Sequence, residues 1–176
     1  FDGKRPFSEI VREACSHGYT EPDPRDDLSG LDVARKAVIL AREVGLDLEL
    51  QEVHVESLVP EELIKAEVQE FLERLAEHDD ALGKRYQSAR QAGQVLRYVA
   101  DLNIKTRDVG VRLQEFPVDH PFASISLTDN IVQFVTRRYC KNPLIIRGPG
   151  AGPDVTAAGI FADLLRLCSM LSANND

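Results

Sequence analysis

The chain contains no tryptophan, a single methionine and only three cysteines in 176 residues. The cysteines, Cys15, Cys140 and Cys168, are odd in number and far apart, which argues against a disulfide scaffold and favours a reducing compartment. Basic residues are also scarce: 21 Lys and Arg stand against 29 Asp and Glu, for a net charge of −8. We therefore expect no nucleic-acid partner, because binding phosphates requires clustered Lys and Arg.

Long apolar runs are missing as well. No uninterrupted stretch approaches the roughly 18 residues of a membrane span, and no signal peptide is visible at the start. We therefore expect no membrane partner and a cytoplasmic location, or a plastid location if the source is a plant. The 43% of hydrophobic residues is an ordinary fraction, and the length suits one domain with a real core. Since the first residue is Phe1 rather than Met, we expect the chain to be part of something longer.

Helical patterns precede strand patterns along the sequence, and a helical pattern closes it. Helical periodicity covers residues 7–17, 31–45, 61–66, 68–75, 82–92 and 154–171. Strand-like patterns cover residues 48–55, 95–102, 109–116, 131–139 and 144–146, with a hairpin turn at 103–108. This order predicts an α+β domain over residues 1–171, with a mainly antiparallel or mixed sheet, helices on one face and a tail at 172–176.

The most informative stretch is the acidic segment Gly18–Lys36, which contains two prolines and is expected to start extended. Ser29 is predicted to cap the following helix, with Asp32 as its capping-box partner. Asp32 and Lys36 lie four residues apart and therefore on one helix face. From spacing alone, a solvated ion pair explains these two residues better than a catalytic role, which requires a lysine that exchanges a proton near neutral pH.

Metal binding has little support. The carboxylates of the acidic segment offer oxygen ligands, but their spacing fits no EF-hand loop. The four histidines show no zinc-ligand spacing either. We expect no metal site in this chain, and a metal-dependent hydrolase built on the acidic segment remains the third and weakest alternative.

A glycine-rich stretch, Gly148–Gly152, follows an apolar run and precedes the last helix. Glycines there permit close approach of a ligand to the backbone, and a helix N-terminus offers free N–H groups. The stretch is not a dinucleotide fingerprint, because Pro153 breaks the G-x-G-x-x-G register. Taken alone, it is best explained as a structural turn.

Taken together, these motifs closely resemble homoserine dehydrogenase, and their wording is nearest to the bifunctional aspartokinase–homoserine dehydrogenases. The similarity runs from about Phe7 to about Leu171. It is carried by Gly18–Lys36, Ala41–Glu43, Glu56–Pro60, Val95–Val99, Asp129-Asn130 and Pro143–Leu167, the last of which includes Arg147–Gly152 and Val155–Gly159.

The resemblance implies an NAD(P)-dependent oxidoreductase that interconverts L-homoserine and L-aspartate 4-semialdehyde in the aspartate pathway, on the route to threonine and methionine. It assigns proton transfer to Lys36, with Asp32 orienting the substrate and the lysine. It places Glu21 on the substrate ammonium group and Asp27 in the same pocket.

The resemblance also implies a cofactor-facing loop that contains Gly150 and Gly152. The Rossmann fingerprint is absent from the sequence, so NADP or NAD is expected to bind mainly to a domain that this chain lacks. The last helix, 154–171, is expected to pack on that domain. The resemblance further implies a homodimer formed through the sheet, and nucleotide-binding and possible aspartokinase domains in the parent protein. The alternative is a non-catalytic folding and dimerisation module, inactive without the nucleotide-binding domain.

Overall fold

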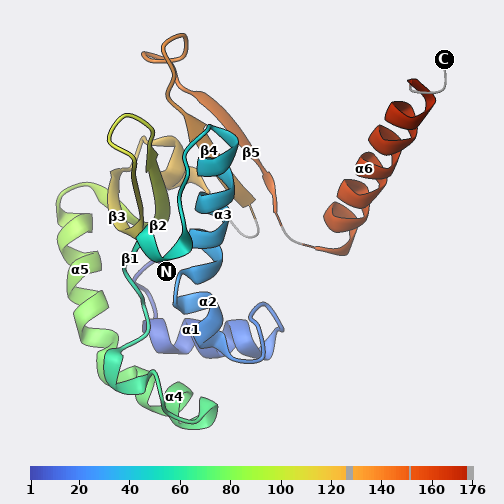
Figure 1. Ribbon diagram of the computed structural model, residues 1–176. Helices are drawn as coiled ribbons and strands as arrows, with labels where there is room; N and C mark the ends of the chain where they lie inside the picture. The colour runs from blue at the N-terminus through green and yellow to red at the C-terminus, as the bar shows by residue number, and fades with distance from the viewer. Residues whose placement is uncertain (126–128, 151, 174–176) are drawn as a thin grey trace. The chain divides into compact units, whose positions relative to one another are not determined.

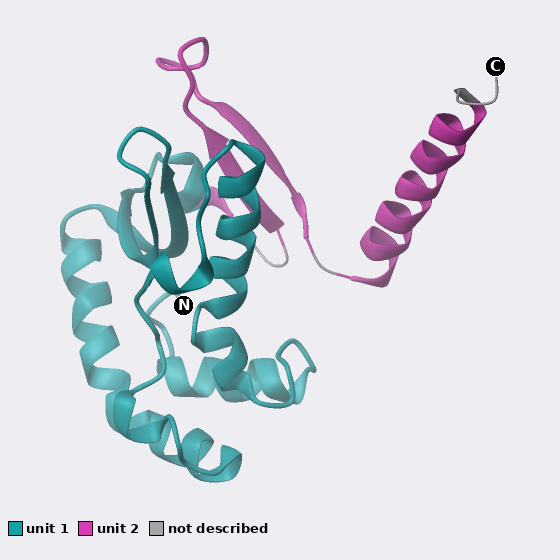
Figure 2. Cartoon of the chain, in the orientation of Figure 1, with its two compact units in different colours: residues 1–123 teal, residues 124–176 magenta. Residues whose placement is uncertain are grey.

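The computed structural model describes residues 1–125, 129–150 and 152–173 (Figure 1). The chain divides into two compact units, residues 1–123 and 124–176, and each is described by itself (Figure 2). Unit 1 carries the acidic segment, and unit 2 carries the glycine-rich stretch. The predicted tail at 172–176 begins too early, because the last helix continues to Ala173, and residues 174–176 lie outside the described residues.

Unit 1 is built from helices and short 3₁₀ turns around a small sheet. Its α-helices are α1 (Phe7–Ser16), α2 (Pro24–Leu28), α3 (Leu31–Glu43), α4 (Val68–Arg74) and α5 (Asp79–Gln91). The 3₁₀ turns are Leu50–Glu52, Glu61–Leu63 and Leu75–His78, and a fourth, Pro121–Ser124, ends at the first residue of unit 2. The predicted helices therefore exist, although α5 starts three residues earlier than expected and the stretch at 61–66 shrinks to one 3₁₀ turn.

The expectation of an extended segment around the two prolines was wrong at α2. Pro24 occupies the first helical turn, where a missing N–H costs no intrahelical hydrogen bond. Asp23 precedes it as the N-cap, and its carboxylate accepts the Arg25 N–H at 3.0 Å. A short helix is thereby formed where proline alone suggested extended backbone.

The predicted cap of α3 is also different. Gly30, with φ +77°, is the N-cap residue, and Ser29 closes α2 instead. The Ser29 hydroxyl still accepts the Leu31 N–H at 3.3 Å, but the Ser29 N–H already donates to the Arg25 carbonyl. Asp32 therefore has no capping-box partner at Ser29 and pairs with Lys36.

The sheet of unit 1 is three-stranded and mixed. Strand β2 (Gln94–Asn103) pairs antiparallel with β3 (Asp108–Pro117), which also pairs in parallel with the short β1 (His54–Val55). The hairpin turn is confirmed, and the Asn103 side chain accepts the N–H groups of Lys105 and Thr106 there. The strand predicted at 48–55 is reduced to two residues, because a reciprocal Glu49–Glu52 capping box closes a 3₁₀ turn.

One face of this sheet is buried under helices, as predicted for an α+β domain. Side chains of β2 and β3 on that face pack against α3 and α5, so the rigid hairpin supports both helices. The sheet residues in these two clusters are Leu96, Tyr98, Leu102, Val109, Val111 and Leu113. A further cluster joins α1 to α4 around Phe71, which is fully buried.

Unit 2 contains an antiparallel ribbon and one long helix. Strands β4 (Asp129–Phe134) and β5 (Leu144–Pro149) pair with each other, and α6 spans Pro153–Ala173. The strand predicted at 131–139 was too long, because Thr136 and Tyr139 bond to each other in a turn after β4. The described residues thus form two separate sheets rather than one.

Helix α6 changes one expectation. Residues Pro153–Ser172 are long and apolar enough to cross a membrane by length and composition, with a mean hydropathy of 1.4. The expectation that no segment qualifies considered only uninterrupted apolar runs. Helix α6 meets the criterion through its mean hydropathy, although Asp163 and Arg166 form an ion pair within it at 3.3 Å.

Candidate active site

Asp27 fixes the backbone of Glu21. Its carboxylate accepts the Glu21 N–H at 2.9 Å, across six residues of the acidic segment. The Thr20 hydroxyl donates to the Glu21 carbonyl at 2.9 Å. Both carboxylates are exposed, so the Glu21 side chain is held at its base while its oxygens stay accessible. The structure therefore brings together Glu21, which was predicted to meet the substrate ammonium group, and Asp27, which was predicted to lie in the same pocket.

Lys36 and Asp32 form an ion pair of 2.7 Å on the first half of α3. Their side chains are 67% and 59% exposed, so solvent weakens the attraction between them. The predicted geometry, with both side chains on one helix face, is confirmed. The role of Lys36 as the proton-transfer residue stays a prediction.

Arg25 anchors the acidic segment to the rest of unit 1. Its guanidinium contacts the Asp23 carboxylate at 2.6 Å and also donates to the Leu63 and Ile64 carbonyls at 3.2 and 3.0 Å. The side-chain hydrogen bond from Arg25 is the largest cause that lowers the pKa of Asp23. Arg25 also lies 5.6 Å from the centre of the Phe71 ring.

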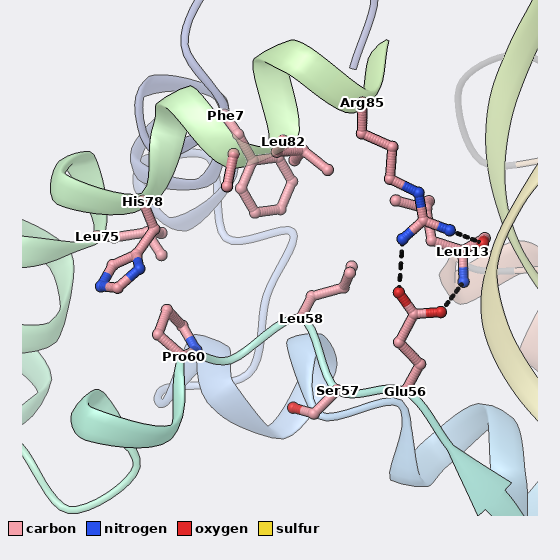
Figure 3. A pocket seen from close by; sticks show the side chains of 11 residues that line it. Phe7, Glu56, Ser57, Leu58, Pro60, Leu75, His78, Leu82, Arg85 and Leu113 are labelled. Atoms are coloured by element: carbon pink, nitrogen blue, oxygen red, sulfur yellow. Dashed lines mark hydrogen bonds and ion pairs between the residues drawn. The ribbon is translucent and has the colours of Figure 1, made fainter. Parts of the chain in front are cut away.

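The cavity beside this region does not contain the predicted site. A cavity of about 230 Å³ opens between α5 and the segment after β1 (Figure 3). Glu56 and Arg85 lie at one end of it, joined by an ion pair of 2.6 Å. None of the six predicted site residues lines the cavity. Sequence reasoning gave Glu56 no role, although it stands in a matching segment, Glu56–Pro60.

The two glycines predicted to face the cofactor differ in their surroundings. A Cβ at Gly150 would overlap the Asn130 side-chain amide, which would have to move to admit any larger residue. Gly152 has φ +120° and open space where a side chain would lie. Gly152 thus offers bare backbone to a flat ligand, and Ala151 between the two lies outside the described residues.

Possible metal ligands and thiols lie at several positions in the described part of the chain. No group of three or more His, Cys, Asp or Glu side chains is arranged there to hold a metal ion. Cys15, Cys140 and Cys168 are all free thiols.

The family is shown by comparison with known sequences. A sequence profile of the homoserine dehydrogenase family matches residues 1–165. The chain is 53% identical over 174 residues to a chloroplastic bifunctional aspartokinase/homoserine dehydrogenase 2 from Zea mays, covering 98% of this chain and 19% of the relative. It is 46% identical over 171 residues to a homoserine dehydrogenase from Emericella nidulans, covering 94% of this chain and 46% of the relative.

Solved structures similar to this chain were found as well. A Candida auris protein of unknown function shares 45% identity with a TM-score of 0.89, covering 94% of this chain and 47% of that one. A putative homoserine dehydrogenase from Archaeoglobus fulgidus shares 27% identity with a TM-score of 0.71, covering 93% and 43%. The chain thus spans about a fifth of the bifunctional plant relatives and less than half of the shorter proteins. This chain belongs to the homoserine dehydrogenase family of oxidoreductases.

Proposed function

We propose that this chain is the substrate-binding and catalytic portion of an NAD(P)-dependent homoserine dehydrogenase, which interconverts L-homoserine and L-aspartate 4-semialdehyde. The observation that carries the proposal is the Asp32–Lys36 pair of 2.7 Å, which stands in a chain whose family is shown. The proposed reaction belongs to the pathway that leads to threonine and methionine.

The chemistry follows from the reaction. Oxidation of homoserine removes a hydride from the carbinol carbon and a proton from its hydroxyl group. Lys36 is proposed to accept that proton and to return it in the reverse direction, which is general acid–base catalysis. Asp32 holds the lysine nitrogen and orients the substrate. The nicotinamide cofactor exchanges the hydride when it is bound.

Substrate recognition falls to the acidic segment. Homoserine and aspartate semialdehyde both carry an ammonium group, and a fixed carboxylate forms a charge-assisted hydrogen bond with such a group. Glu21 supplies that carboxylate, and Asp27 both holds the Glu21 backbone and adds negative charge. The hydrogen bonds to the Glu21 backbone support this role, because they hold the charge in place before the substrate arrives.

The cofactor, NADP or NAD, belongs mainly to a nucleotide-binding domain outside this chain. Gly152 fits a contact with the nicotinamide, because its backbone is bare on one side. Apolar side chains spread over a wide arc of α6, which suits burial against that domain. The exposed members include Val155, Phe161, Leu164, Leu165 and Leu171.

The relatives also suggest the assembly. Several are bifunctional aspartokinase/homoserine dehydrogenases, so we include a possible aspartokinase domain in the parent protein. A homodimer through the sheet belongs to the same proposal. It is supported by exposed apolar residues on both strands of the β4–β5 ribbon, namely Val132, Phe134, Leu144, Ile145 and Ile146. That exposure also favours the alternative, a module that folds and self-associates without turnover.

The direct test is Lys36→Ala in the enzyme that contains the nucleotide-binding portion. The rate should fall by about 10²-fold or more, the effect of removing one acid–base group. A small primary amine in the buffer should restore part of the rate. Lys105→Ala, at an exposed lysine of the β2–β3 turn, serves as the matched control. Near-normal turnover of Lys36→Ala across pH would refute the assignment.

A further inference from the structure

Gly30 lies at the bend between α2 and α3, which we call the Gly30 corner. Its N–H donates to the Asp27 carbonyl at 3.4 Å, and its own carbonyl accepts the Ala34 N–H at 2.9 Å in the first turn of α3. The corner therefore joins Asp27 directly to the helix that carries Asp32 and Lys36. Its φ of +77° is a conformation that glycine adopts without strain.

Tyr98, on β2, lies against this corner. A Cβ at Gly30 would overlap the Tyr98 hydroxyl and approach Val55, so the ring leaves room only for glycine. The same hydroxyl donates to the Glu56 carbonyl at 2.6 Å. Burial raises the pKa of Tyr98 above its ordinary value. The corner is thus supported by one oriented side chain rather than by loose packing.

Glu56 in turn is fixed from several directions. Its N–H donates to the Val111 carbonyl at 2.8 Å, which ties its backbone to β3. Its carboxylate accepts from Arg85 of α5 at 2.6 Å and from the Leu113 N–H at 3.2 Å (Figure 3). Arg85 also donates to the Leu113 carbonyl. The oxygen that receives the Tyr98 hydroxyl therefore belongs to a rigid junction of sheet and helix.

We propose that Tyr98, held in place by Glu56, is a positioning residue that sets the Gly30 corner and through it the placement of Asp32 and Lys36. The inference rests on the proposed function, because it matters only if Lys36 transfers the proton. The physical basis is the precision that catalysis requires. A misplacement of about 1 Å at a reacting group can cost about a hundredfold in rate. Contact of the first turn of α3 with Tyr98 of the β2–β3 hairpin holds these groups more precisely than the exposed Asp32–Lys36 ion pair does.

The test uses Tyr98→Phe in the enzyme that contains the nucleotide-binding portion. This change removes only the oxygen that contacts Glu56 and the corner. The kcat for homoserine oxidation should fall about tenfold, a partial misplacement on the same scale, with the KM for NADP nearly unchanged. The solvent deuterium isotope effect on kcat should rise, because a misplaced Lys36 makes proton transfer slower than the other steps.

Tyr86→Phe is the matched control. Tyr86 lies on α5, its ring packs edge-on against Phe1, and no hydrogen bond of its hydroxyl occurs in the described residues. Its kcat and isotope effect should stay at the wild-type values. If Tyr98→Phe behaves like this control, or loses kcat with an unchanged isotope effect, the inference is overturned, since a loss of folded enzyme alone gives the second pattern.

Glu56→Gln provides a second variant if Tyr98→Phe does not fold. It keeps the backbone carbonyl but weakens the carboxylate contacts with Arg85 and Leu113, so a smaller fall in kcat with the same rise in isotope effect is expected. An unchanged isotope effect in a folded Glu56→Gln enzyme overturns the inference. Normal turnover of Lys36→Ala would overturn the proposed function itself, whereas a loss there with an unaffected Tyr98→Phe overturns only the positioning role.

Discussion

The Asp27 carboxylate accepts the backbone N–H of Glu21 at 2.9 Å. The two carboxylates of the acidic segment are therefore not equivalent. One holds the chain, and the other is left accessible at the end of a fixed backbone. This division of labour gives different expectations for variants at the two positions.

Glu21→Gln should raise the KM for homoserine with little change in kcat. An ammonium contact is similar in the ground and transition states, so its loss affects binding more than chemistry. A charged hydrogen bond contributes about 1.5–3 kcal/mol, so the KM should rise by about tenfold or more. Steady-state kinetics of the complete enzyme measure this, with Glu43→Gln at the end of α3 as an exposed control. An unchanged KM would exclude Glu21 from ammonium recognition.

Asp27 should respond differently to Asn and to Ala. Asn keeps an oxygen that accepts the Glu21 N–H, whereas Ala leaves this backbone group without its partner. Asp27→Ala should therefore raise the KM for homoserine more than Asp27→Asn does. The two variants can be compared in the same kinetic assay. Equal KM values would mean that the backbone hydrogen bond does not place Glu21.

Asp23 should make the fold sensitive to acid. Its folded-state pKa is lowered, first by the hydrogen bond from Arg25, so its stabilising effect is complete above the unfolded-state pKa of about 3.9. That effect is lost as the pH falls through the lower folded-state value. Asp23→Asn, which keeps the capping oxygen, should lower the Tm near neutral pH and match the wild type progressively as the pH falls.

Thermal unfolding between about pH 6 and pH 2 measures this difference in Tm. Asp119→Asn, at an exposed carboxylate after β3, is the control and should show no such convergence. A difference in Tm that stays constant down to pH 2 would contradict the role of the Asp23–Arg25 pair.

The isolated chain should not bind NADPH. The phosphates of a dinucleotide require a glycine-rich turn at a helix N-terminus within a βαβ unit, and this sequence has no such fingerprint. Titration of NADPH into the 176-residue chain should show no saturable binding at micromolar concentrations, whereas adding the nucleotide-binding portion should restore it. Circular dichroism of the same sample verifies that the chain is folded. Tight NADPH binding by this chain alone would refute the proposal that a separate domain binds the cofactor.

The sequence by itself determined the elements with strong local signals and the family. The β2–β3 hairpin is marked by alternation around Asn103, and α3 by helical periodicity that continues to Glu43. The spacing of Asp32 and Lys36 placed both on one helix face, because that relation depends only on the pitch of a helix.

Tertiary structure decided what depends on contacts between distant segments. The hydrogen bond from Tyr98 to Glu56 spans 42 residues, and the bonds from Arg25 to the Leu63 and Ile64 carbonyls span 38 and 39. No local pattern encodes such pairs, so sequence reasoning assigned Tyr98 no role. The prediction of extended backbone also failed at α2. There the Asp23 cap and a proline in the first turn favour a helix.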